Sequence, residues 1–336
     1  MGVWAVVLAW YCITQGFPFD RGNQTLWILG GLGAAAVGRP LFSVRRILID
    51  WIPFIAILYV YDYSRHLADL LGRPILETTQ IHWDSALFGV VPTVWLQQHF
   101  YDPFQVHWWD SVASLVYVSH FIAVWAIAAV LYLRNRREWF LWARVVIVLS
   151  FAALITFAIV PSAPPWYASR DGYLPPVERI ATRGLDGLGI HWARQLIDTG
   201  AAFSNDVAAI PSLHTGFAIL IAVWFVGRIP RRHRWWGQPL LIAYPVVMLL
   251  VLVYGAEHYV VDGLFGLVYV LGAVYGLRLW DHWRARRSLD REAAALEAAA
   301  LDADGRQEDL ATAGASAEHA TQPHEPQAET HGPAAG

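Results

Sequence analysis

The sequence predicts an all-α protein, a polytopic bundle of membrane-spanning helices, and three observations support this expectation. Of the 336 residues, 56% are apolar and only 15% are charged, whereas soluble domains carry about 25% charged residues. The chain contains 18 Trp, a side chain that concentrates where a bilayer meets water. Apolar runs close to 20 residues long, the length that crosses a bilayer as a helix, recur along the sequence.

Eight runs are expected to form the spans, with about two of them preceding a six-helix core: 3–19, 24–38, 47–66, 111–133, 141–160, 211–229, 239–256 and 262–282. The first run follows Met1 without a basic segment, which favours a membrane helix over a cleaved signal peptide. The second is short and rich in Gly and Ala. The stretch 81–100 carries Asp84, Pro92 and His99, so it is interpreted as an interfacial or re-entrant segment instead of a ninth span.

The loops between these runs differ in charge, and the difference predicts a topology. Short loops rich in Arg occur at 39–46, 134–137, 228–234 and 282–287, whereas the other loops lack such clusters. Basic loops generally remain in the cytoplasm. The spans then alternate without conflict, both termini are expected in the cytoplasm, and the protein is expected in a bacterial plasma membrane.

The chain is expected to divide into three parts. Residues 1–110 hold the first spans and an outer loop, residues 111–287 hold the catalytic core, and residues 288–336 form a cytoplasmic tail. This tail is rich in Ala, Glu, Asp and Pro and has no aromatic residue. It begins with the helix-compatible stretch REAAALEAAAL, but its composition cannot bury a core, so a largely disordered extension is expected.

Three segments gather polar and chemically active residues, and the predicted topology places all three on the non-cytoplasmic face. They are VPSAPPW at 160–166, AIPSLHTG at 209–216 and YGAEHYVVD at 254–262. Each lies at the end of a predicted span. Because they would meet on one side of the membrane, they are interpreted as one site.

The second of these segments predicts a helix that starts beside a bound anion. Pro211 suits the opening of a helix, and the Ser212 side chain can cap its free amides. A helix N-terminus binds anions readily, and His214 would project from its first turn. Alternatively, Ser212 only caps the helix and His214 is an interfacial polar residue.

The third segment places His258 and Asp262 four residues apart, on one face if the segment is helical. The carboxylate of Asp262 could fix the imidazole tautomer and leave the other ring nitrogen free to attack phosphorus. An interfacial hydrogen bond without catalytic function is the alternative. Two His and one Asp could also hold a divalent ion, although the usual clustered carboxylates are absent from the segment.

The motifs IPSLHTG and HYVVD resemble two of the three signature motifs of the type 2 phosphatidic acid phosphatase superfamily, commonly written KxxxxxxRP, PSGH and SRxxxxxHxxxD. Together with the upstream PSAPPW, they look closer to the branch that contains inositol phosphorylceramide synthase. The resemblance covers about residues 111–282 and leaves the first spans and the tail outside it. It implies a metal-independent lipid phosphatase or phosphotransferase with a six-helix core.

The resemblance also implies roles for individual residues. His258 would be the nucleophile that forms a phosphohistidine, Asp262 would orient it, and His214 would protonate the departing alkoxide and later activate the acceptor. Ser212 and the following amides would hold phosphate oxygens. The expected substrate is a membrane lipid phosphate with water or a small alcohol such as inositol as acceptor. No cofactor, metal or nucleic-acid partner is expected.

The departures from the family pattern concern its cations. All 24 basic residues are Arg, so the first motif cannot exist in its usual form, and Leu252 stands where the third motif has its Arg. A phosphoryl transition state still requires positive charge. Arg170 is the first candidate replacement, Arg65 the second and Arg194 the third, and each could instead be an ordinary juxtamembrane Arg.

Three aromatic residues, Trp166, Tyr167 and Tyr259, could line the lipid path or stack on a headgroup, and interfacial anchoring would explain them equally well. The competing function is a non-catalytic membrane transporter or scaffold. A transporter should show polar residues or helix breaks near the middle of paired spans. In this sequence the polar residues gather at the span ends, which favours an enzyme.

Overall fold

Helices form the regular structure of this protein in the residues that the computed structural model describes, which are 2–14, 21–38, 41–69, 71–201 and 205–320. The longest eight in this described part overlap the eight expected runs: α1 (Gly2–Thr14), α2 (Arg21–Ala36), α3 (Leu41–Asp69), α6 (Trp108–Arg134), α7 (Arg136–Ile159), α11 (Leu213–Phe225), α12 (Arg234–Tyr254) and α13 (Val260–Ala320). Residues 15–19 of the first expected run lie outside the described residues. The predicted all-α fold class is confirmed.

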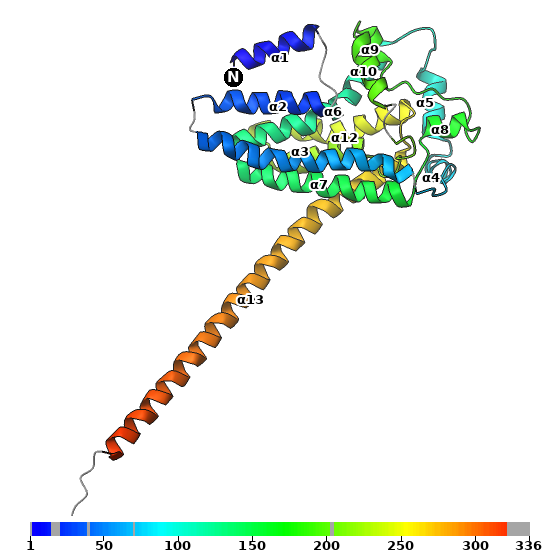
Figure 1. Cartoon of the computed structure of the whole chain (residues 1–336). Coiled ribbons are helices and arrows are strands. Elements are labelled where there is room, and N and C mark those ends of the chain that lie inside the picture. The colour runs from blue at the N-terminus through cyan, green and yellow to red at the C-terminus, as the bar shows by residue number, and fades with distance from the viewer. Residues whose placement is uncertain (1, 15–20, 39–40, 70, 202–204, 321–336) are drawn as a thin grey trace, which may run out of the picture. The chain divides into compact units, whose positions relative to one another are not determined.

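The remaining described helices are short: α4 (Thr79–Phe88), α5 (Pro92–Phe100), α8 (Pro165–Arg170), α9 (Gly184–Gly187), α10 (His191–Ala201), η1 (Val226–Arg228) and η2 (Arg231–His233). In Figure 1, α4, α5, α8, α9 and α10 gather at one end of the bundle, whereas α2, α3, α6 and α7 run alongside one another. The predicted reactive segments lie in or next to the loops at the end with the short helices.

Four helices of the described chain are both long enough and apolar enough to cross a membrane: Trp108–Arg134, Arg136–Ile159, Arg231–Tyr254 and Val260–Ala299. The protein is therefore an integral membrane protein. The expected run 211–229 forms only the 13 residues of α11 followed by the 3-10 turn η1. A helix of that length rises about 20 Å, which is less than the roughly 30 Å of a bilayer core.

Helix α3 is fastened to the core through a buried charge. Asp50 is almost fully buried and receives hydrogen bonds from Arg136, at 2.5 Å from Nε to Oδ2, and from the Tyr132 hydroxyl at 3.0 Å. Next to Asp50, the Trp51 ring lies 5.4 Å from the Trp139 ring, and both are buried. Helix α3 thus packs along α7 as part of the bundle.

The stretch expected to be interfacial or re-entrant forms two short helices, α4 and α5, joined at Gly89. Gly89 has a φ of 75°, a left-handed conformation that a residue without Cβ adopts without strain. The hairpin buries polar residues and exposes apolar ones. Its buried polar residues are Gln80, Asp84, Thr93 and Gln97, and its exposed large apolar residues are Trp83, Leu87, Phe88, Val90, Trp95 and Phe100.

The chain separates into two compact units, residues 1–276 and residues 277–336. The first holds the bundle and all three reactive segments. The second continues α13 to Ala320, so the stretch REAAALEAAAL is helical as the sequence suggested. A largely disordered extension was expected after Ser288, whereas the structure has helix over residues 288–320.

Candidate active site

The turn between α12 and α13 carries the histidine and carboxylate of the third segment. His258 lies in this turn and Asp262 in the first turn of α13, with His258 Nδ1 3.3 Å from Asp262 Oδ2. The same oxygen accepts the Tyr259 N–H at 2.8 Å. Both side chains are buried, Asp262 completely. Because Asp262 occupies Nδ1, the Nε2 atom at the opposite edge of the His258 ring is the one that faces away from the carboxylate.

His258 precedes α13, whereas Asp262 lies in the first turn of α13. The two side chains therefore lie close together without sharing a face of one helix, which differs from the expectation. The turn depends on Ala256, which has a φ of 60° and is fully buried. A residue with a Cβ pays about 1–2 kcal/mol for this left-handed conformation. The amides of Glu257 and His258 both donate to the Leu252 carbonyl, which fixes the turn to the end of α12.

The second segment brings a second imidazole to the first. Ser212 is the N-cap of α11, with its Oγ accepting the Thr215 N–H, so the predicted capping is observed. Ser212 also donates its own N–H to the Asp262 carbonyl at 3.0 Å, which links the starts of α11 and α13. The rings of His214 and His258 consequently lie 5.6 Å apart, centroid to centroid.

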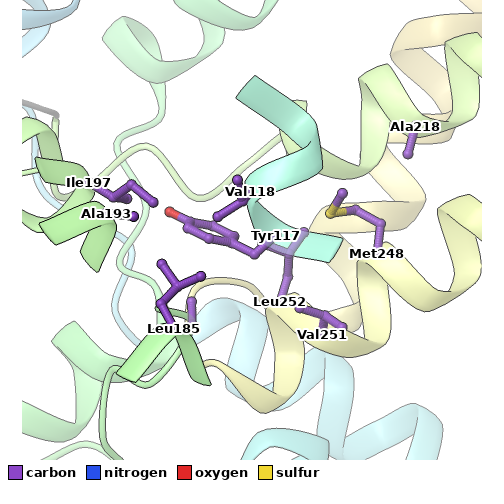
Figure 2. Close-up of a cluster of buried hydrophobic side chains, with 10 residues drawn as sticks. Tyr117, Val118, Leu185, Ala193, Ile197, Ala218, Met248, Val251 and Leu252 are labelled. Atoms are coloured by element: carbon purple, nitrogen blue, oxygen red, sulfur yellow. The ribbon is translucent and has the colours of Figure 1, made fainter. Parts of the chain in front are cut away.

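Helix α6 adds two residues that the sequence reasoning did not single out. The His120 ring lies 4.1 Å from that of His214, and the Tyr117 ring stacks on His214 at 5.4 Å. Figure 2 shows Tyr117 among apolar side chains from α9, α10 and α12, including Leu185. An ionisable residue within an apolar span, such as His120, is a functional signal that could have been used.

The first segment is hydrogen-bonded to the start of the second segment and to the stretch of chain just before it. Ser162 is fully buried, its N–H donates to the Val207 carbonyl and its Oγ accepts the Ile210 N–H at 2.9 Å. The Trp166 N–H donates to the Ala256 carbonyl in the turn that carries the site histidine. PSAPPW therefore connects the stretch before α11 to the stretch before α13.

The α4–α5 hairpin supports the same turn with two buried polar side chains. Asp84 accepts the N–H groups of Val260 and Val261 at 2.9 and 3.1 Å, so it caps the start of α13. Gln97 donates from Nε2 to the carbonyls of Glu178 and Tyr254, and its Oε1 accepts the Glu178 N–H. The hairpin thereby holds both ends of the α12–α13 turn and the neighbouring loop.

The motifs, their order and their convergence at two adjacent helix starts agree with a match to a known family. The sequence model of the PAP2 superfamily matches residues 80–276, more than half of the chain. The chain belongs to the PAP2 superfamily.

The chain is also similar to the phosphoinositol dihydroceramide synthase of Bacteroides thetaiotaomicron. It is 27% identical over 231 residues, which cover 66% of this chain and 74% of the relative. No solved structure matches. The family match and this relative confirm the suspected superfamily and agree with its inositol phosphorylceramide synthase-like branch. They support a membrane lipid phosphatase or phosphotransferase.

The PAP2 match begins at α4, so the hairpin with its Asp84 cap falls inside the family region. The structure also explains one departure from the PAP2 motifs. Leu252, which replaces the Arg of the third motif, is fully buried in the apolar cluster drawn in Figure 2. A cation at this position would be buried among apolar side chains, at a high energetic cost.

The arginines expected to replace the missing PAP2 cations lie in different settings. Arg170 is exposed, binds Asp171 and lies over the Tyr167 ring at 4.0 Å. Arg194 binds Asp186 and Asp198. Arg65 belongs to α3, but its side chain lies outside the described residues. None of these interactions joins the two histidines, and the proposed phosphate-binding role of each arginine stays a prediction.

A different arginine lies beside the His258 turn. Arg179 donates from Nε and Nη2 to the two carboxylate oxygens of Glu257 at 2.8 and 3.0 Å. Its guanidinium also lies 5.0 Å from the Trp166 ring. Burial lowers the pKa of Arg179, but the charge and hydrogen bonds of Glu257 more than offset this, so its pKa lies above the usual value. No motif marks Arg179 in the sequence.

The aromatic candidates differ in accessibility. Trp166 is half-buried near two arginines. Tyr259 is fully buried in an apolar cluster with Ala163, Leu174 and Val261, away from any surface on which a headgroup could stack. Among the described residues, no group of three or more His, Cys, Asp or Glu side chains has a metal-binding arrangement.

Proposed function

We propose that this protein moves a phosphoryl or substituted phosphoryl group from a membrane lipid to an acceptor hydroxyl, by way of a phosphohistidine at His258. The observation that supports this most strongly is the pair of imidazoles 5.6 Å apart, one of which has Asp262 at its Nδ1 atom. A nucleophile held by an orienting carboxylate and facing a second imidazole is the arrangement that covalent catalysis requires.

The first step forms a bond from His258 Nε2 to phosphorus and breaks the bond from phosphorus to the leaving lipid oxygen. His214 donates its proton to that oxygen and becomes neutral. In the second step His214 removes a proton from the acceptor hydroxyl, whose oxygen attacks phosphorus. The nitrogen–phosphorus bond then breaks, and the free His258 and protonated His214 are restored. Neither step consumes an external oxidant, reductant or metal.

Phosphate oxygens would be held at the N-terminus of α11. The first N–H groups of a helix have no partner within it and carry partial positive charge. The hydroxyl of Ser212 is occupied with Thr215. Its contribution to phosphate binding would therefore come from fixing this helix start, with the amides of the first turn serving as the donors.

The acceptor is proposed to be an alcohol. The similar protein is named a phosphoinositol dihydroceramide synthase, and a synthase name supports transfer of a phospho-headgroup over hydrolysis in this chain as well. The candidate for the transferred group is therefore a phosphoinositol headgroup. The candidates for the acceptor are inositol, as a small alcohol, and water, which would make the protein a phosphatase. Purified protein in liposomes, assayed against phospholipids and polyprenyl phosphates with and without each alcohol, distinguishes these cases.

The site is proposed to face the non-cytoplasmic side, with both termini in the cytoplasm, because the Arg-rich loops lie at the opposite ends of the spans. Reporter fusions after Arg137 and after Gly172 test this orientation. A cytoplasmic signal from the first fusion and an external signal from the second are expected. The reverse pattern would contradict the proposed orientation.

The central test is turnover in three site variants. His258→Ala, His214→Ala and Asp262→Asn should each lower kcat about 10³-fold or more, because a triad-like unit loses most of its function with any member. His282→Ala, an exposed histidine on α13, is the control and should retain full turnover.

Two further measurements make the test decisive. Brief incubation with lipid labelled at phosphorus should leave acid-labile, base-stable label on the wild type and none on His258→Ala. Chelators should leave turnover unchanged. Full activity of His258→Ala would reject the mechanism, strong inhibition by chelators would favour a metal site, and wild-type protein without any turnover would favour a transporter or scaffold.

A further inference from the structure

A cation is still missing from this site, and the proposed reaction needs one. The transferred phosphoryl group carries negative charge over its equatorial oxygens. The chain has no Lys, and position 252 lies in an apolar cluster. Two imidazoles alternate between charge states during the cycle, so neither supplies a permanent positive charge.

Arg179 is attached to the loop next to the nucleophile. Its partner Glu257 directly precedes His258, and the Glu257 side chain is only 10% exposed, whereas that of Arg179 is 35% exposed. The guanidinium is thus anchored on the protein side and accessible on the other. Its two bonds to Glu257 use Nε and Nη2, and no acceptor among the described residues receives a hydrogen bond from Nη1.

The backbone that carries Arg179 is also fixed. Gln97 binds both the N–H and the carbonyl of Glu178, and the Ile180 N–H donates to the Gly255 carbonyl in the His258 turn. The Trp166 ring covers one side of the guanidinium. A charged group held at this many points is preorganised, which is what electrostatic stabilisation of a transition state requires.

On the basis of the proposed function, we propose that Arg179 binds the non-bridging oxygens of the transferred phosphate through its Nη1 edge, with Glu257 holding the guanidinium in position. Arg179 thereby supplies the permanent charge that the usual motif positions lack. It is a substrate-binding residue, whereas Glu257 and Gln97 are positioning residues.

Other arginines on the same loops are occupied differently. Arg183 donates to the Gln105 carbonyl and lies over the Tyr101 ring. Arg194 is shared between two aspartates of the α9–α10 region. Arg170 lies over Tyr167 and is paired with its chain neighbour, without a bond to the His258 turn. Arg170 is the strongest competitor, so it belongs in the test.

The test measures turnover and anion binding separately. Arg179→Gln should lower kcat about 100-fold or more, the effect of losing one charged donor at a developing charge. Arg179→Lys should recover part of this loss, because it keeps the charge but not the planar fork. Arg73→Gln, which removes an exposed arginine elsewhere in the described chain, is the matched control and should retain turnover.

The anion probe is orthovanadate, which mimics the five-coordinate geometry of phosphoryl transfer. Vanadate should raise the unfolding temperature of the wild type and of Arg73→Gln, but not that of Arg179→Gln. Glu257→Gln should lower kcat by about 10-fold, and the double variant should be no worse than Arg179→Gln alone, because Glu257 acts through Arg179.

The outcomes separate this inference from the proposed function. Loss of turnover in His258→Ala together with full turnover and vanadate protection in Arg179→Gln would overturn the assignment of Arg179 and leave the mechanism in place. Loss in Arg170→Gln with retention in Arg179→Gln would transfer the role to Arg170. A wild type without phosphate turnover would reject the proposed function itself.

Discussion

The reactive pair at His258 depends on a carboxylate from a distant part of the chain. Asp84 lies on α4, is fully buried, and accepts the amide N–H groups of Val260 and Val261 at the start of α13. Burial raises the pKa of Asp84 to about 6, the two amide bonds lower it, and the nearby Asp262 charge raises it. The folded protein therefore binds a proton at Asp84 more tightly than the unfolded chain does.

This difference predicts how stability depends on pH. Because the folded pKa lies above the unfolded value, the contribution of Asp84 to stability is complete below about pH 4 and is lost as the pH rises through about 6. The stability of the wild type relative to Asp84→Asn should accordingly fall between pH 4.5 and 7. Thermal unfolding of both proteins in detergent across this range measures it. A difference that is constant or increases with pH would contradict the prediction.

At the same scale, the sequence indicated that the imidazoles and the carboxylate would lie close together, whereas it gave no indication of Arg179. His214, His258 and Asp262 lie in short motifs at helix ends, so local spacing and one shared membrane face were enough to bring them together. Arg179 reaches the site only through the folding of the 171–183 loop, held by Gln97 from another hairpin. Such a contact has no local sequence pattern, whereas Arg170 was favoured because it follows PSAPPWY closely in the sequence.

At the scale of elements, the site exists because α11 and α13 start close together. Gly266 on α13 faces the start of α11, and a Cβ added there would lie 2.8 Å from the Ser212 carbonyl oxygen. The Ser212 N–H bond to Asp262 joins the same two helices. The relative position of His214 and His258 therefore depends on this close approach of two backbones.

Gly266→Ala should separate the two helix starts. We expect a loss of about 1–3 kcal/mol in stability from overpacking, and a fall in kcat of about 10-fold or more because the imidazoles move apart. The matched control is Gly272→Ala on the same helix, where an added Cβ meets no atom within 4 Å. Equal turnover in the two variants, measured with their unfolding temperatures, would show that the contact does not position the site.

The boundaries of the helices were predicted well where the apolar runs are long. They were predicted less well where a capping residue determines where a helix begins or ends. The runs 111–133 and 141–160 correspond closely to α6 and α7. Helix α11 is shorter than its apolar run because Ser212 fixes its start and the backbone turns to a 3-10 helix at residue 226. The segment 81–100 was correctly separated from the spans, but its capping of α13 through Asp84 could not be inferred from its own sequence.

For the molecule as a whole, the PAP2 region and the rest of the bundle are not independent. Helix α3 lies outside the matched residues 80–276, but its Asp50 is buried against Arg136 at the start of α7. An isolated buried carboxylate would be costly, so the pair requires both helices. The N-terminal helices were predicted to lie outside the catalytic core. One of them, α3, nevertheless packs against the core.

The C-terminal part should behave in the opposite way, and truncation tests this. Residues 282–299 are exposed in the described helix, and the tail composition cannot bury a core. Removing residues 291–336 should therefore leave turnover and unfolding temperature within about 2-fold and a few degrees of the full chain. Ending the chain at Gly276 is the matched contrast: it shortens the apolar span that begins at Val260 to 17 residues, fewer than the roughly 20 that cross a bilayer. The protein that ends at Gly276 should lose stable membrane insertion and all turnover. A large loss of turnover after removal of residues 291–336 alone would contradict the prediction and assign the tail a role in the reaction.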